Sequence, residues 1–357
     1  MGLAVGSDVV RGGTMLRRAE KVGRRFLNPV PTSVGDLSTI FKVLPLYVSN
    51  KEEKVPRRRL GPFATDVSVY GVAPGSGLRV TWMGHSTMLV EIDGVRVLID
   101  PVWDERASPM RWVGPRRFFA APLRLGDLPK VDVVLVSHDH YDHLGESTIR
   151  ELARLESMRG AAWVTSLGVG EILRRFGVRG ERITELDWTE SVAVGGGSLE
   201  ITAVPARHFS GRGMFNRFET LWSSFVLKGK EHTVYFGADS GWWEGFAEIG
   251  AVYGPFDLTM LEIGAFDELW AGIHLGPDGA ARAFEALGGA DAQRRGLMMP
   301  IHWGLFDLAL HSWRQPIERL VELAGEKGIL LWAPEPGRPT EVVVGVEMRS
   351  DWWRRST

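Results

Sequence analysis

The sequence predicts an α/β fold in which two groups of strands form packed sheets and helices cover their outer faces. Three observations support this. Short runs of β-type residues recur from residue 78 to residue 301, segments with helical periodicity separate many of them, and turn residues bound most runs. A sheet buries a hydrophobic face only against another layer, so strands in two groups with helices between them imply stacked layers.

The strands begin at residue 78, with runs of β type over 78–83, 87–92 and 95–100. Asp93-Gly94 between the last two is a hairpin signal. Residues 101–127 read as a long loop with interleaved arginines and aromatic residues, and such loops often carry function. Beyond the loop, the pattern predicts strands over 131–136, 162–165, 182–187, 191–195, 198–204, 223–228, 232–237, 257–263 and 296–301, and helices over 146–156, 168–176, 243–252, 278–287 and 313–327.

The first 77 residues are expected to form an arm that wraps the main domain, residues 78–357. Over residues 8–27, five arginines and a lysine accompany apolar residues at spacings of four, three and four, which predicts a basic amphipathic helix. Such a helix either packs its apolar stripe on the main domain, the interpretation we favour, or lies on an anionic membrane surface. Residues 28–77 are rich in Pro and Gly and read as an irregular segment.

Composition excludes several classes of protein. The 357 residues carry a formal net charge of -2, which argues against a strongly basic nucleic-acid binder. The chain has no cysteine, so any metal site must be built from His, Asp and Glu. No apolar stretch approaches the length of about 18 residues that a membrane span needs, and the first thirty residues lack a secretory signal. We therefore expect a cytoplasmic protein, with peripheral contact at the inner membrane surface as an open alternative.

The residues that follow the apolar strand 131–136 form the motif on which the site prediction rests. His138, His140, Asp142 and His143 lie within six positions. An extended or tightly turned segment directs His138 and His140 at one point, because alternate residues share a face. Asp142 and His143, at the next bend, face a second point. Imidazoles and a carboxylate without thiolates suit zinc, manganese or iron in a hydrolytic site.

Three more polar residues follow apolar strands in the same way: His208, Asp239 and His302. Taken singly, each is more often a structural residue than a ligand. Together with the first motif they make seven ligands, which divide between two divalent metal ions. One set would comprise His138, His140 and His208, the other Asp142, His143 and His302, with Asp239 bridging both. Zinc is the default metal, and manganese or iron are alternatives.

The same residues resemble the metallo-β-lactamase fold superfamily, and within it the N-acyl-phosphatidylethanolamine phospholipase D-like family. The similarity extends from about residue 78 to residue 330 and includes, in order, Trp82-Met83-Gly84-His85-Ser86-Thr87, Asp100-Pro101, Gly114-Pro115-Arg116-Arg117, Ser137-His138-Asp139-His140-Tyr141-Asp142-His143-Leu144, Glu185-Leu186-Asp187-Trp188, Ala238-Asp239-Ser240-Gly241 and Ile301-His302-Trp303-Gly304. The resemblance implies a four-layer αββα sandwich with a two-metal site along one edge of the inner sheets.

Further roles follow from the chemistry of these side chains and, for His274, from the resemblance. Asp142 and Asp239 would orient a metal-bridging hydroxide, the nucleophile of the reaction. His274 matches a family histidine near the substrate and would donate to a phosphoryl or amide oxygen; a helix-entry histidine without a catalytic role is the alternative. In the long loop, Arg111, Trp112, Arg116 and Arg117 are candidate substrate contacts, since guanidinium groups suit phosphate. A solvated loop is the alternative for the arginines.

The sequence therefore predicts a metal-dependent hydrolase, best a phosphodiesterase of phospholipase D type that acts on N-acyl-phosphatidylethanolamine-like phospholipids. A lactonase or other ester hydrolase on the same metals stays open, since the ligands do not separate these reactions. A long apolar groove beside the metals would favour the lipid, and a small closed pocket the lactone. A third hypothesis is a membrane-surface binding protein without enzymatic activity. The tail Asp351-Trp352-Trp353-Arg354-Arg355 is typical of an interface with lipid or with the second subunit of a homodimer.

Overall fold

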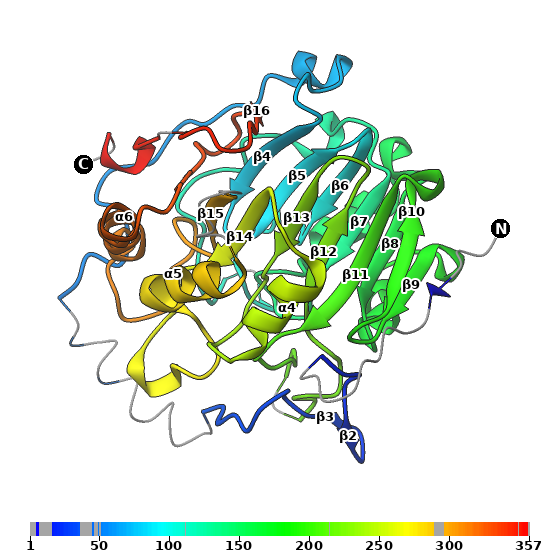
Figure 1. Cartoon of the computed structure of the whole chain (residues 1–357), viewed down its shortest axis with the longest axis horizontal. Helices are drawn as coiled ribbons and strands as arrows, with labels where there is room; N and C mark the ends of the chain where they lie inside the picture. Colours follow the sequence, from blue (N-terminus) through cyan, green and yellow to red (C-terminus); the bar gives the residue numbers. More distant parts are fainter. Residues whose placement is uncertain are drawn as a thin grey trace.

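The computed structural model describes residues 5–6, 16–35, 45, 49, 51–110, 112–213, 215–288, 296–348 and 350–355. Within these ranges two seven-stranded sheets lie face to face (Figure 1). The first sheet has the order β1-β10-β11-β12-β13-β14-β15. It is antiparallel from β1 to β13 and parallel from β13 to β15. Its strands are β1 Val5–Gly6, β10 Ser191–Val194, β11 Leu199–Pro205, β12 Ser223–Lys228, β13 Thr233–Phe236, β14 Leu258–Glu262 and β15 Leu297–Ile301.

The second sheet has the order β16-β4-β5-β6-β7-β8-β9. It is antiparallel from β16 to β6 and parallel from β6 to β9. Its strands are β4 Leu78–Gly84, β5 Thr87–Ile92, β6 Val95–Ile99, β7 Val133–Val136, β8 Ala162–Ser166, β9 Ile183–Leu186 and β16 Thr340–Glu341.

Helices form the two outer layers. On the first sheet, α5 (Gly276–Ala286) packs against β14, with α4 (Gly245–Tyr253) and α6 (Gln315–Lys327) beside it. On the second sheet, α3 (Val169–Arg175) packs against β8 and β9, and α2 (Glu146–Leu152) follows β7. The order of layers is therefore helix, sheet, sheet, helix, which confirms the predicted αββα architecture.

Strand β7 shows why the apolar runs are continuous. Val133 and Leu135 belong to the core between the sheets, whereas Val134 and Val136 belong to a second core under α2 and α3. Successive side chains of a strand point to opposite faces, so a strand covered on both faces is apolar at every position. This burial fixes the carboxyl end of β7, from which the metal motif begins.

The helix expected over residues 8–27 is wrong for the part that the structure describes; residues 7–15 lie outside the described residues. A two-stranded hairpin of β2 (Lys21–Val22) and β3 (Arg25–Phe26) occupies this stretch instead. Val22 is 67% exposed and Phe26 is 2% exposed, so the two residues do not share one buried face.

Tertiary packing explains the hairpin. Phe26 packs in a small aromatic core with Trp188 and Trp222, and its backbone N–H donates to Phe218 O at 2.8 Å. The Lys21 ammonium lies 3.9 Å from the Phe26 ring centroid. These contacts need an extended backbone at Phe26, and they outweigh a helical periodicity that is only a weak preference.

The tryptophan tail is also not the free interface that its composition suggested. Trp352 and Trp353 lie in a 3₁₀ helix, η7 (Trp352–Arg354), and each is 2% exposed. The Trp352 ring lies 5.4 Å from the ring of Trp303 and 5.9 Å from that of Trp82, measured between centroids. Trp353 Nε1 donates to Glu318 Oε1 at 3.0 Å. Both indoles therefore stabilise their own chain rather than a lipid or subunit contact.

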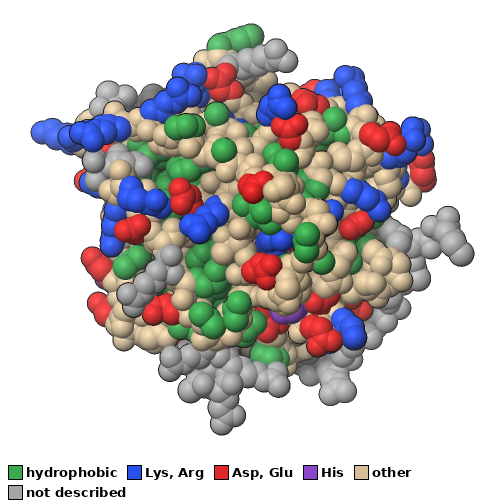
Figure 2. All heavy atoms as spheres, turned by 90° about the horizontal axis from the view of Figure 1, so that it is seen from above, with side chains coloured by type: hydrophobic (Ala, Val, Ile, Leu, Met, Phe, Trp, Pro, Cys, Tyr) green, Lys and Arg blue, Asp and Glu red, His purple; other side chains and the backbone are tan. Residues whose placement is uncertain are grey.

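Two surface properties agree with the composition. Over the face seen in Figure 2, basic and acidic side chains are interspersed rather than separated into single-sign patches. Among the described residues, no helix combines the length and the apolar character that crossing a bilayer requires.

Candidate metal centre

The structure brings all seven predicted ligands together at one edge of the two sheets. His138, His140, Asp142 and His143 follow β7, while His208, Asp239 and His302 follow β11, β13 and β15. The carboxyl ends of these strands converge on one rim, and the loops after them place the side chains. Sequence spacing could not establish this convergence, because the ligands come from both sheets.

The first group consists of His138, His140 and His208. His138 Nε2 lies 2.9 Å and His208 Nε2 lies 3.3 Å from His140 Nδ1. Asp239 joins this group, with Oδ2 3.9 Å from His138 Nε2 and 3.6 Å from His208 Nε2. One ligand atom from each of these four residues lies within 4.8 Å of every other.

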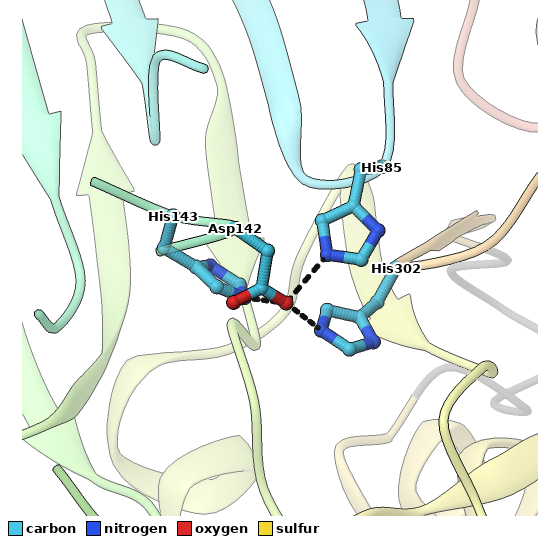
Figure 3. Close-up of side chains that lie close together, drawn as sticks. All are labelled: His85, Asp142, His143 and His302. Atoms are coloured by element: carbon cyan, nitrogen blue, oxygen red, sulfur yellow. Dashed lines mark hydrogen bonds and ion pairs between the residues drawn. The ribbon is translucent and has the colours of Figure 1, made fainter. Parts of the chain in front are cut away.

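The second group consists of Asp142, His143 and His302 (Figure 3). Asp142 Oδ2 lies 3.2 Å from His302 Nε2 and 3.7 Å from His143 Nε2. Asp239 contacts this group as well, with its oxygens 3.2 Å from His143 Nε2 and 3.1 Å from His302 Nε2. Asp239 thus reaches both groups, which is the position predicted for a bridging ligand.

The donor chemistry of the first group fits a cation. Burial lowers the pKa of His138 well below its ordinary value, and lowers the pKa of His140 and His208 to about 3. The three imidazoles are therefore neutral. His208 Nδ1 donates to Ile273 O at 2.8 Å, so its Nε2 carries a lone pair. Three buried imidazoles whose nitrogens lie 2.9 and 3.3 Å from His140 Nδ1 cannot all satisfy one another, and a metal ion would satisfy them.

Ion pairing dominates the second group. Burial opposes charge on both histidines, but Asp239 and Asp142 raise the pKa of His302 to about 10 and raise that of His143 well above its ordinary value. Burial likewise opposes ionisation of both aspartates, but the neighbouring histidines hold the pKa of each well below its ordinary value. A metal ion bound here would be held by His143 and His302 through nitrogen lone pairs, and its binding would release the protons that these atoms carry in the metal-free protein.

Asp100, which directly follows β6, was missed as a site residue although it occupies the same place after a strand as the predicted ligands. Its carboxylate is fully buried and accepts from Ser137 N at 2.7 Å, from Ser137 Oγ at 2.6 Å and from His143 Nδ1 at 2.7 Å. Ser137 Oγ in turn lies 2.9 Å from His138 Nδ1. Asp100 therefore orients one histidine of each group and turns both Nε2 atoms toward the site.

His85, in the turn between β4 and β5, extends the second group. Its Nε2 lies 3.0 Å from Asp142 Oδ2, and its Nδ1 is buried without a hydrogen-bond partner among the described residues (Figure 3). A proton on Nε2 leaves Nδ1 as an unpaired acceptor, whereas a proton on Nδ1 would leave a buried donor unpaired. The first arrangement makes His85 a donor to Asp142 rather than a ligand.

Backbone strain is concentrated at this rim. His85, Asp100, Ala238, Ala265 and His302 have φ between 39° and 62°. Non-glycine residues adopt this region rarely and keep it only where the surrounding structure determines it, most often at functional sites.

Glu262, the last residue of β14, is the second buried carboxylate that the sequence reasoning missed. Its Oε1 accepts from Ser240 N and Leu275 N, and its Oε2 lies 2.6 Å from His274 Nδ1. Burial and the Asp239 charge raise the pKa of Glu262 well above its ordinary value, and burial lowers that of His274 to about 4. In its neutral form Glu262 would donate to His274 Nδ1, which leaves the proton of a neutral His274 on Nε2 as a donor.

A cavity of about 1980 Å³ opens beside the metal groups. His140, Asp142, Asp239, His274 and His302 line it from the site. Apolar side chains form much of the remaining wall, among them Phe118, Phe119, Phe209, Phe215, Trp270 and Ile273. This volume exceeds the roughly 300–1,000 Å³ of typical small-ligand pockets, so the cavity suits a large substrate with apolar parts.

The predicted substrate contacts divide between the cavity and its surroundings. Arg116 and Arg117 line the cavity; Arg116 Nε donates to Glu105 Oε1 at 2.8 Å, and burial lowers the pKa of Arg117 to about 10. Trp112 is 75% exposed and is not among the residues that line the cavity. Arg111 lies outside the described residues.

Comparison with known proteins agrees with this geometry. A model of a beta-lactamase superfamily domain matches residues 95–303. The chain is 34% identical over 257 residues to N-acyl-phosphatidylethanolamine-hydrolyzing phospholipase D 1 of Caenorhabditis elegans, covering 70% of each chain. It is 45% identical over 279 residues to an uncharacterized protein of Mycobacterium tuberculosis, covering 78% of this chain and 72% of that one.

Solved structures share the fold. An isothiocyanate hydrolase from Delia radicum gut bacteria matches with a TM-score of 0.58 at 20% identity, covering 74% of this chain and 99% of that one. Igni18, a metallo hydrolase from the archaeon Ignicoccus hospitalis, matches with a TM-score of 0.54 at 22% identity, covering 74% and 97%. At these identities the likeness concerns the fold, and it confirms the predicted fold type.

Proposed function

Because this chain belongs to the metallo-β-lactamase superfamily of metal-dependent hydrolases, within the N-acyl-phosphatidylethanolamine phospholipase D-like family, we propose that it is a phosphodiesterase of phospholipase D type. Its substrate would be an N-acyl-phosphatidylethanolamine-like phospholipid. The relative named above is described as hydrolysing N-acyl-phosphatidylethanolamine, which supports this choice.

One observation carries the proposal: two groups of largely buried His and Asp side chains face a large cavity whose wall includes Arg116, Arg117 and many apolar side chains. Each feature matches one part of a phospholipid: the metal ligands match the phosphodiester, the arginines its negative charge, and the apolar wall its acyl chains. The size of the cavity favours a lipid over a small lactone, since a lactone would be matched by a small closed pocket.

His138, His140 and His208 would hold one divalent ion, and Asp142, His143 and His302 the other, with Asp239 shared. Zinc is the first choice, with manganese or iron as alternatives. When bound, such ions act as Lewis acids on phosphoryl oxygens and lower the pKa of a water toward about 7.

The chain's own residues then have distinct tasks. Asp142 and Asp239 present carboxylate oxygens that accept hydrogen bonds from the attacking water and orient it. His274, whose Nε2 carries a proton while Glu262 donates to its Nδ1, donates to a phosphoryl or amide oxygen of the substrate. The Arg116 and Arg117 guanidinium groups attract the anionic phosphodiester into the cavity. The water oxygen would form a bond to phosphorus as the P–O bond to the N-acylethanolamine breaks. The leaving oxygen would take a proton derived from the water, which gives N-acylethanolamine and phosphatidic acid.

We also propose peripheral contact with a lipid surface through two exposed aromatic residues, one of which lines the cavity. Trp112 is 75% exposed and Phe215, which lines the cavity, is 86% exposed. Aromatic residues are favoured at membrane–water interfaces. Replacing both by alanine is expected to weaken cosedimentation with phospholipid vesicles. Val72→Ala, at another highly exposed apolar residue (71%) that does not line the cavity, should leave vesicle binding unchanged. Equal binding of all variants would contradict this contact.

The direct test is incubation of metal-replete protein with a defined N-acyl-phosphatidylethanolamine, with products identified by mass spectrometry. Chelator-sensitive release of phosphatidic acid and N-acylethanolamine is the expected result. Metal-loaded protein without lipid turnover would contradict the proposed substrate and redirect attention to smaller esters, including lactones.

A further inference from the structure

The amino-terminal arm reaches the metal centre through residues 28–35. Asn28 Nδ2 donates to the backbone O of His208 at 2.7 Å, and the backbone N–H of His208 donates to Asn28 Oδ1 at 2.9 Å. One side-chain amide thus satisfies both backbone groups of a predicted ligand. Asn28 and His208 are 180 positions apart in the sequence.

This pair of hydrogen bonds replaces a missing strand neighbour. His208 follows the end of β11 at Pro205, where the ladder to β12 has ended. The residue is 1% exposed, and buried backbone groups need partners. The primary amide of Asn28 offers the donor and acceptor of a neighbouring peptide group and so holds the His208 backbone as a strand would.

Further hydrogen bonds hold the same stretch of the arm against the site. Arg207, next to His208, donates from Nε to Thr32 Oγ1 at 2.9 Å and from Nη2 to Pro31 O at 3.3 Å. Arg217 Nη1 donates to Gly35 O at 2.8 Å, and Gly35 lines the cavity. The arm therefore contacts a ligand, the residue beside it and the cavity wall.

We propose that the arm is a working part of the metal centre and that Asn28 is a positioning residue for His208. With the backbone of His208 fixed by Asn28 and its Nδ1 fixed by Ile273 O, the imidazole has one direction in which Nε2 can point. Without Asn28, two buried backbone groups lose their partners and the backbone at His208 must move to recover them. The inference rests on the proposed function, because it assumes that His208 binds a metal.

The test compares three variants of the full chain. Asn28→Ala removes both hydrogen bonds to His208. Thr32→Val keeps the volume of the side chain and removes its hydroxyl, which accepts from Arg207 Nε and donates to Val30 O, while Arg207 retains its bond to Trp242 O. Arg18→Ala is the matched control, because it removes an arm contact to Glu190 that involves no site residue.

Two quantities are measured for each: the dissociation constant of Zn²⁺, by competition with a chromophoric chelator, and the melting temperature of the metal-stripped protein. We expect Asn28→Ala to weaken zinc binding by about ten- to a hundredfold, as loss of a ligand-orienting contact does. Thr32→Val should have a smaller effect, and Arg18→Ala none. If Asn28→Ala does not fold, Asn28→Asp, which loses the donor to His208 O, is expected to weaken zinc binding as well.

A lower melting temperature with unchanged zinc affinity in the Asn28 variant would overturn the inference, because it would make the contact purely structural. Absence of zinc binding by the unaltered protein is a separate outcome; it would overturn the proposed function itself.

Discussion

Replacement of Asp100 by Asn is the sharpest perturbation that the metal centre offers. The change keeps shape and volume and removes one acceptor. Ser137 N is a fixed backbone donor, so the amide oxygen must remain opposite it. The amide NH₂ then faces Ser137 Oγ and His143 Nδ1, the two groups that donate to the carboxylate in the unaltered protein.

The consequence is a change of tautomer. His143 can accept from the new amide only if Nδ1 carries no proton, and the proton of the neutral imidazole then lies on Nε2, the atom that points into the site. Ser137 Oγ also loses its acceptor, which disturbs its contact with His138 Nδ1. Loss of one such orienting partner lowers metal affinity by about 10- to 100-fold, or about 1.4–2.7 kcal/mol. Because Asp100 serves both groups, we expect the upper part of this range.

A matched control exists in the same chain. Asp93 accepts from His232 Nδ1 at 2.7 Å and from two backbone N–H groups, in a turn away from the metal motif. Asp93→Asn therefore disrupts the same kind of Asp–His pair, but its histidine, His232, is not a predicted metal ligand. Zinc competition titrations should show a large loss for Asp100→Asn and none for Asp93→Asn. Equal affinities in both variants would refute the assignment of Asp100 as an orienting residue.

Three further predictions follow from the same geometry. A Cβ on Gly264 would lie 2.0 Å from the backbone O of His302, so Gly264→Ala should cost about 1–3 kcal/mol of unfolding free energy and weaken metal binding. Gly126 has open space around it, so Gly126→Ala should change neither the unfolding free energy nor the metal affinity. Chemical denaturation and zinc titration measure the two quantities. Glu262→Gln keeps a donor to the histidine at 274 and should retain most hydrolysis, whereas Glu262→Ala should lose it; steady-state kinetics would contradict a neutral Glu262 if both variants were equally inactive. Protonated His302 pairs with Asp239 and Asp142, and this ion pairing stabilises the metal-free fold fully below about pH 6.5. The stabilisation is lost as the pH rises through about 10. Metal binding at His302 would release the same proton, so binding competes with the ion pairing. The melting temperature gained on adding zinc should therefore increase from about pH 6.5 to about pH 9, and a constant gain would contradict the ion pairing.

Much of the site was predictable because it obeys one rule. Polar residues that directly follow buried strands lie on one rim, and His208, Asp239 and His302 were found that way. Asp100 and Glu262 carry the same signal, but a carboxylate after a strand is common, and only the structure shows which histidine each one contacts.

Other features had no local signal. The bond between Asn28 and His208 joins residues 180 positions apart, and no periodicity encodes it. The helical spacing over residues 8–27 was real but weaker than the packing of Phe26 in its aromatic core. Trp352 and Trp353 looked like interface residues because tryptophan next to arginine is common at interfaces. Their burial against Trp303 depends on tertiary packing, which the local sequence does not encode.

The central claim is that seven side chains hold two ions, with Asp239 shared between them. The most direct measurement is the metal stoichiometry of stripped protein reloaded with zinc, determined by elemental mass spectrometry for the unaltered chain and for Asp239→Ala. The account predicts two zinc ions per chain and a loss affecting both sites in the variant. A single ion per chain, or an Asp239→Ala variant that still holds two with unchanged affinity, would contradict it.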